Sequence, residues 1–123
     1  MTAAILQHKL SQDVTDFIDQ RREEAEHAFD VFRQTRTITA NGTVNFVERI
    51  PNENKLVTIN YAGPWARDRK SSISVETLEG EVLVGRPGGG GRYNKLFIQH
   101  DDVTTISHVH SPNLGAWAQT HRS

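Results

Sequence analysis

The 123-residue sequence contains no cysteine and no long apolar run, and neither sign of charge dominates it. Without cysteine, disulfides and thiolate metal sites are excluded, and a reducing compartment, the cytoplasm, is favoured. No window approaches the ~18 apolar residues of a membrane span, and the N-terminus lacks the pattern of a signal peptide. With 14 basic and 15 acidic residues, we expect no nucleic acid and no membrane as partner.

Size and composition describe one soluble domain. A chain of this length can bury about two-thirds of the surface that its unfolded form exposes. Hydrophobic residues make up 36% of the sequence and charged residues 24%. There are no repeats, and no linker separates two domains. We therefore expect a single domain over residues 1–123, with residues 1–10 as a flexible lead-in or a first helical turn.

Apolar residues at spacings of three and four predict an amphipathic helix from about Ser11 to Gln34. Ser11 is a suitable N-cap, and Asp13 gives the first turn a negative charge. Only Arg21 interrupts the apolar stripe, which we expect to pack over a β-sheet. The stripe contains Val14, Phe17, Ile18, Ala25, Ala28, Phe29 and Phe32.

Short strands closed by tight turns follow this helix, which favours an antiparallel sheet. Two short helices are also predicted, over 93–99, with Leu96 and Phe97 inward, and over 114–120. The predicted strands are 44–49, 55–61, 72–77, 81–84 and 103–110, with a further strand beginning at 37–39. The predicted turns are 41–42, 51–54 and 79–80.

Two histidines stand one residue apart at the end of the last predicted strand. His108 and His110 follow the β-branched and apolar run 103–106. Because residues i and i+2 of a strand point to the same face, both imidazoles leave the sheet side by side and can share one metal ion. Zinc accepts imidazole nitrogen at ~2.0–2.1 Å, and nickel, iron, cobalt and manganese accept it as well. The spacing therefore predicts a divalent metal site.

Two ligands do not complete such a site. A third must come from elsewhere in the fold or from a neighbouring subunit, and His27, His100 and His121 are candidates. A helix starting after Ser111 would present unpaired N–H groups to an anionic substrate, or Ser111 only caps that helix. A cupin also carries His-x-His on a strand, but it needs a Glu a few residues later, where this chain has no acid.

The region of the histidines resembles the class II aldolase/adducin family, whose members carry D-V-x-x-x-x-H-T-H-S followed by a helix. Here the corresponding stretch runs from Asp102 to Ser111. Earlier segments match in the same order, so the resemblance covers about residues 11–123. The other matching positions are Asn45 and Arg49 in a G-N-x-S-x-R strand, Gly63 in a small-Gly turn, and 75–85 in a D-G-x-V-x-x-G hairpin.

The resemblance implies an α/β fold, a three-layer α/β/α domain around a largely antiparallel sheet, shortened here at its C-terminus. It implies a divalent metal, usually zinc, held by His108, His110 and a third, downstream histidine. Such a metal polarises a carbonyl and stabilises an enediolate during aldol cleavage, epimerisation or decarboxylation. The family acts on small hydroxy-carbonyl substrates such as sugar phosphates. The resemblance also implies a homo-oligomer, a dimer or tetramer, with the site near subunit boundaries.

The sequence departs from the family where the acid/base belongs. Family members have P-S-S-E about twenty residues before the histidine pair, with Ser residues that hold phosphate and a Glu that moves protons. Here Pro87 is followed by four glycines. The N–H groups of Gly88 and Gly89 can cradle an anion, or the run is a hinge. Tyr93 lies near the place of the missing Glu and is a candidate general acid, or else a half-buried helix residue.

The expected function is thus that of a metal-binding, aldolase-like protein, a C–C lyase or epimerase acting on a small-molecule substrate. The alternative is a non-catalytic binding or assembly module that retains the fold, as the adducin branch of the family does. The expected site residues are His108 and His110 for the metal, Tyr93 for proton transfer, and Asn45, Gly63, Gly88, Gly89 and Ser111 for the substrate.

Overall fold

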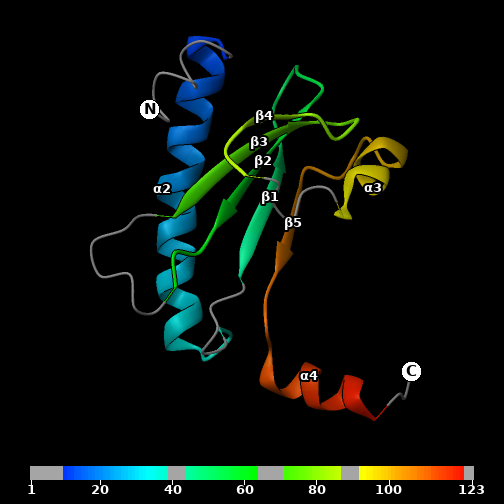
Figure 1. Cartoon of the computed structure of the whole chain (residues 1–123). Coiled ribbons are helices and arrows are strands. Elements are labelled where there is room, and N and C mark those ends of the chain that lie inside the picture. The colour runs from blue at the N-terminus through cyan, green and yellow to red at the C-terminus, as the bar shows by residue number, and fades with distance from the viewer. Residues whose placement is uncertain (1–9, 39–43, 64–70, 87–91, 121–123) are drawn as a thin grey trace.

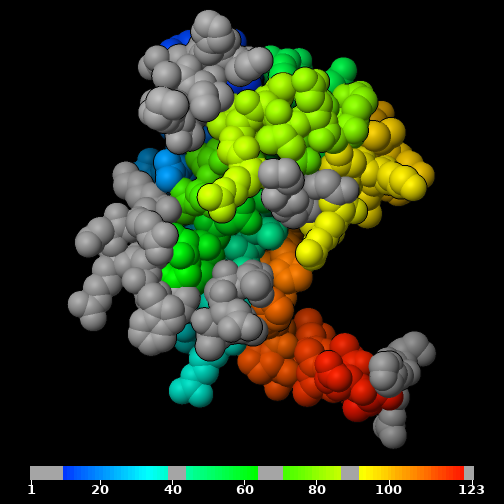
Figure 2. All heavy atoms as spheres, in the orientation of Figure 1, coloured from blue at the N-terminus to red at the C-terminus, as the bar shows by residue number. Residues whose placement is uncertain are grey.

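The computed structural model describes residues 10–38, 44–63, 71–86 and 92–120. Its elements in chain order are α2 (Gln12–Gln34), β1 (Asn45–Arg49), β2 (Lys55–Asn60), β3 (Ser72–Thr77), β4 (Val82–Val84), α3 (Asn94–Gln99), β5 (Thr105–His108) and α4 (Pro112–Gln119). The strands form one antiparallel sheet in the order β4-β3-β2-β1-β5. Helix α2 lies along one face of the sheet, and α3 lies near the start of β5 (Figure 1). Helix α4 projects beyond the end of β5, apart from the sheet (Figures 1 and 2).

The mixed α/β class and the antiparallel sheet are confirmed, and the five strands expected between residues 44 and 110 are present. The long helix begins as predicted, because the Ser11 hydroxyl accepts a hydrogen bond from the Val14 N–H at 3.3 Å. Among the described residues, no helix is both long enough and apolar enough to cross a bilayer. The predicted turn at 79–80 is also present, whereas the one at 41–42 lies outside the described residues.

Three local predictions are wrong. Thr37 and Ile38 do not begin a strand, because the Thr37 N–H instead closes the end of α2 by donating to the Phe32 carbonyl at 2.9 Å. Leu96 is 40% exposed, since a helix as short as α3 turns only Phe97 into the core. Leu10 is not part of a loose lead-in but is buried against α2 and the sheet.

The main hydrophobic core lies between α2 and the sheet. The apolar stripe of α2 packs against alternate strand residues, because every second side chain of a strand points to the same face. Phe29 contacts two aromatic rings of the sheet, with centroid distances of 5.6 Å to Phe46 and 5.4 Å to Tyr61. The buried residues of this core are Leu10, Val14, Ile18, Ala25, Phe29, Val44, Ile50, Val57, Ile59, Val75 and Val84.

A second, smaller core lies on the opposite face of the sheet, under α3. Arg49 ties α3 to this face, because its guanidinium donates to the carbonyl oxygens of His100 at 3.1 Å and Val103 at 3.2 Å. The same group also donates to the carbonyl of Phe97 and lies 5.3 Å from the centre of its ring. Helices therefore lie on both faces of the sheet. The cluster consists of Val47, Leu56, Leu78 and Phe97, with Tyr93, Val103 and Ile106 packed against it.

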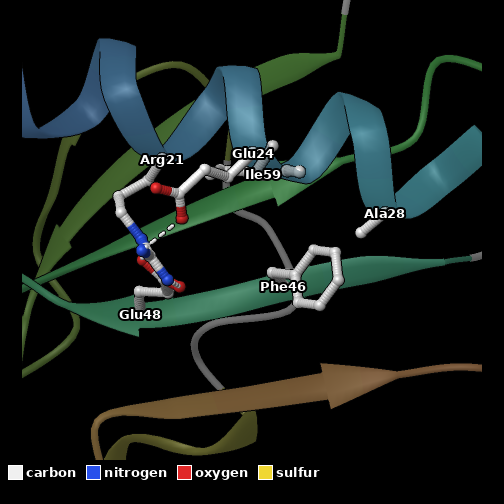
Figure 3. Close-up of a pocket in the computed structure, with 7 residues that line it drawn as sticks. Arg21, Glu24, Ala28, Phe46, Glu48 and Ile59 are labelled. Carbon is white, nitrogen blue, oxygen red and sulfur yellow. Dashed lines mark hydrogen bonds and ion pairs between the residues drawn. The ribbon is translucent and has the colours of Figure 1, made fainter.

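Arg21 interrupts the apolar stripe because it pairs with a buried carboxylate of the sheet. Its Nε and Nη2 donate to the two carboxylate oxygens of Glu48 on β1, each at 2.6 Å (Figure 3). The Glu48 side chain is only 7% exposed. Hydrogen bonding to Glu48 raises the pKa of Arg21 above its ordinary value. Thr105 on β5 also donates to Glu48, at 3.3 Å, so that this carboxylate joins α2, β1 and β5.

Replacing Arg21 with methionine is expected to destabilise the fold, because it leaves the Glu48 carboxylate buried without its cation. We expect the free energy of unfolding to fall by about 2–3 kcal/mol, measured by urea denaturation. The matched control is Asp30→Asn, which breaks the exposed Asp30–Arg33 pair on the same helix. It should change stability by less than about 0.5 kcal/mol. Equal denaturation midpoints for the two variants would contradict this account.

Gly85 ends β4 with φ +76°, and an added Cβ would lie 2.5 Å from the Ile73 carbonyl oxygen. We expect Gly85→Ala to lower the free energy of unfolding by about 2 kcal/mol or more. Gly115→Ala is the control, because Gly115 lies in α4 with open space around it. That substitution should not destabilise the protein, since alanine favours a helix. Thermal unfolding followed by circular dichroism measures both.

Candidate metal site

The two histidines lie at the end of β5, on the sheet face opposite α2. The register of β1 and β5 pairs Val47 with Ile106 and Asn45 with His108. Val47 and Ile106 belong to the core under α3, and a residue two positions further along a strand keeps the same face. His108 and Asn45 therefore share that face.

The Nε2 atoms of His108 and His110 lie 3.2 Å apart, with ring centroids at 5.0 Å and planes at 75°. Both residues are half-buried. The His110 N–H donates to the Thr37 carbonyl at 2.9 Å, which fixes the chain after β5 against the segment that follows α2. Backbone contacts on both sides therefore hold the two imidazoles together.

This separation fits two ligands of one metal ion. Two nitrogens bound to a tetrahedral zinc ion at ~2.0–2.1 Å lie about 3.3 Å apart. A hydrogen bond from one neutral imidazole to the other accounts for the same spacing without an ion.

A third ligand of the usual type does not join the pair within residues 10–38, 44–63, 71–86 and 92–120, where no group of three His, Cys, Asp or Glu could hold a metal. His27 is exposed on α2, which covers the other face of the sheet. His100 ends α3, and its carbonyl is used by Arg49. Neither residue therefore joins the pair within the described part of this chain, and His121 lies outside the described residues.

The register brings an amide to the site instead. Asn45 stands directly across from His108, and its Oδ1 is buried without a hydrogen-bond partner in the described structure. Cβ atoms of such cross-strand pairs lie ~4.5–5.5 Å apart. An amide oxygen can bind a hard divalent ion or accept a hydrogen bond from a ligand of that ion. Asn45 therefore fits the role of a substrate or metal contact.

A row of polar residues extends from Asn45 across the sheet. Asn60 on β2 stands opposite Asn45, and Ser72 on β3 stands opposite Asn60. These two residues were not expected from the sequence, because only the strand register places them in line with His108. This polar row places amide and hydroxyl groups beside the histidines on the same face of the sheet.

The other expected site residues lie in different surroundings. Tyr93 precedes α3 and packs against the core under that helix, on the same face as His108. Gly63 follows β2 with φ +98°. Ser111 takes the N-cap position of α4, as expected, but its side chain makes no capping hydrogen bond. Gly88 and Gly89 lie outside the described residues.

A separate cleft of about 180 Å³ opens between α2 and β1, on the face away from the histidines (Figure 3). Its charged groups, Arg21, Glu24 and Glu48, already bind one another. Its walls are apolar and include Ala28 and Phe46. Because these charged groups bind one another, we interpret the cleft as part of the contact between α2 and the sheet and not as a ligand site.

Comparisons of the chain with protein-family models, with curated proteins and with solved structures found no match. Support for a function therefore comes from the residues and their geometry.

The unpartnered Asn45 oxygen makes a prediction about stability. We expect Asn45→Ala to change the free energy of unfolding by less than about 1 kcal/mol, because no hydrogen bond to Oδ1 is lost. Ser71→Ala is the comparison, since the buried Ser71 hydroxyl accepts from Arg22 Nε at 3.3 Å. It should cost about 1–1.5 kcal/mol in the same urea titration. A larger loss for Asn45→Ala than for Ser71→Ala would contradict a role of Asn45 in binding.

Proposed function

We propose that this chain binds a divalent metal ion, with zinc as the best match, through the Nε2 atoms of His108 and His110. The observation that carries the proposal is the 3.2 Å approach of these two atoms at the end of one strand. The unsatisfied Asn45 oxygen beside His108 supports it, because a buried polar atom without a partner is otherwise unfavourable.

We further propose aldolase-like chemistry, a metal-assisted C–C lyase or epimerase reaction on a small hydroxy-carbonyl compound of the sugar-phosphate type. A metal in this place would supply Lewis-acid stabilisation of negative charge on a substrate oxygen. Asn45 would orient a substrate hydroxyl, and the Tyr93 phenol would give or accept a proton. The resemblance to class II aldolases supports this reading, and we expect the protein to act in the cytoplasm.

Gly63, Gly88, Gly89 and Ser111 remain predicted substrate contacts. Ser111 directly follows His110, and its hydroxyl is not used to cap α4. It is therefore free to contact a ligand of the histidine pair. The N–H groups of the glycine run remain candidates for a phosphate of the substrate.

A second candidate is a non-catalytic binding or assembly module. It is favoured by the ligand count, because the described residues bring only two of the usual metal-binding side chains together. It is also favoured by α4, which buries no residue against the rest of the chain.

Zinc binding tests the metal proposal. We expect isothermal titration of the wild-type protein to give saturable binding that His108→Ala or His110→Ala weakens by about 100-fold. His27→Ala is the matched control, since His27 is exposed on the opposite side of the sheet. If His27→Ala weakens zinc binding as much as His108→Ala, the proposed site is wrong.

Deuterium exchange separates the enzyme from the module. An enediolate forms from dihydroxyacetone when a proton leaves the carbon beside its carbonyl, so a working site exchanges these C–H protons in D₂O. We expect this zinc-dependent exchange in the wild-type protein, and its loss in His108→Ala, by proton NMR. Zinc binding without faster exchange would favour the module.

A further inference from the structure

Exposed apolar side chains concentrate on one side of the molecule. Seven large hydrophobic residues of the described chain are exposed, and five of them lie in or between α3 and α4. We call the surface formed by α3, β5, Val109 and α4 the β5-edge surface. Figure 2 shows that it is hollowed, with α3 and α4 projecting on either side of a concavity. The five residues are Leu96, Ile98, Val109, Leu114 and Trp117, with exposed fractions of 40%, 53%, 38%, 71% and 53%.

The same region lacks charge. Residues 103–120 form a run of 18 without Asp, Glu, Lys or Arg, although charged residues make up 24% of the whole chain. Depletion of charge together with an exposed tryptophan is typical of the centre of a protein–protein interface. An isolated helix as short as α4 is also unstable in water, so it needs a surface to pack on.

The outer edge of β5 is open for pairing. The Arg49 N–H donates to the Thr104 carbonyl at 2.8 Å, which makes this a hydrogen-bonded pair of the β1–β5 ladder. Because such pairs alternate, the backbone groups of Ile106 and His108 point to β1, whereas those of Thr105 and Ser107 point outward. Within the described residues, no hydrogen bond uses these outward backbone groups, and both residues are exposed.

The opposite edge of the sheet is protected, and β5 is not. Strand β4 has three residues, its pairing with β3 shifts register between Val75 and Glu76, and Glu81 precedes it directly. Short length, irregular pairing and charge are the usual devices that keep an edge strand from associating. Strand β5 is also short, with four residues, but it has no Asp, Glu, Lys or Arg, no proline and no register shift. This difference between the two edges indicates that the β5 edge pairs with another strand.

We propose that a second copy of this chain covers it, with the two β5 strands paired antiparallel across a two-fold axis. If Ser107 stands opposite the partner's Ser107, α4 of each copy extends past the start of the other β5, where α3 lies (Figure 1). Leu114 and Trp117 then meet the exposed face of the partner's α3. Each concavity is filled by the α4 of the other copy.

Three features favour a second copy as the occupant. Two uncharged edges pair without repulsion, and the net charge of −1 opposes association only weakly. The charge-free run together with α3 approaches the ~20–30 residues per side of a stable interface. A two-fold pairing also makes the two surfaces self-complementary, since each supplies one exposed helix and one exposed patch.

The pairing also completes the metal site, and this part of the inference depends on the proposed function. With the two serines opposite each other, His108 and the partner's His108 are diagonal neighbours on the same face, ~7–8 Å apart at Cα. Each copy contributes two imidazoles, and zinc takes four ligands. One ion would therefore be shared between two chains. Because four imidazoles leave no open position for a substrate, a shared ion would stabilise the assembly and would favour the binding or assembly module over the lyase.

The test is the mass and the zinc content of the full chain, by sedimentation equilibrium with zinc and with EDTA. We expect zinc to double the mass of 13.8 kDa and to saturate at one ion per two chains. Ser107→Pro removes an outward N–H without touching the β1 ladder, and should weaken the dimer by about 100-fold. Ser107→Ala keeps the N–H and should behave as wild type. Trp117→Glu lies outside the β-ladder and should also yield a monomer. If Ser107→Pro does not fold, Trp117→Glu tests the pairing in its place.

The outcomes separate this inference from the metal proposal. A monomer that binds one zinc ion per chain overturns the pairing and leaves the metal site intact. A wild-type protein that binds no zinc overturns both the metal site and the shared ion. A dimer that withstands both Ser107→Pro and Trp117→Glu shows that copies associate through another surface, and overturns the inference.

Discussion

The ion pair of Arg21 with Glu48 fixes α2, β1 and β5 relative to one another. Its two short hydrogen bonds attach the middle of α2 to β1, and Thr105 attaches β5 to the same carboxylate. Because side chains alternate along a strand, a shift of one residue between β1 and β5 would turn His108 to the α2 face and separate it from Asn45. The register that holds Thr105 beside Glu48 is thus the register that forms the site.

The periodicity of apolar residues predicted the helices and strands well. It did not predict the residues that depart from the pattern, such as Arg21 and Thr37. The stripe of α2 and the alternation of the strands reflect burial of whole faces, which a local pattern records. Arg21 looked like a fault in the stripe, since its partner Glu48 stands 27 residues away and only the register identifies it. Thr37 was expected in a strand because its β-branched neighbours favour one. Its carbonyl instead receives the His110 N–H from a distant segment, which no local pattern contains.

The candidate site was predictable only in part for the same reason. The spacing of His108 and His110 places both rings on one side of a strand, and the structure adds that their Nε2 atoms nearly touch. Asn45 was expected from a family resemblance, whereas its position across from His108 is a matter of strand pairing. Asn60 and Ser72 carry no sequence signal of their own, since asparagine and serine are common in turns and strand ends. Their alignment arises only when three strands are assembled.

Helix α4 has no contact of its own that would set its direction. It buries no residue, and it is attached to the sheet by a connector of three residues in which His110 is the middle one. The backbone of His110 is anchored on Thr37, while its side chain faces His108. Whatever immobilises that imidazole also limits the rotation of the connector. A ligand bound to the two imidazoles would consequently fix the direction of α4. A small ligand would thus control where an apolar helix points.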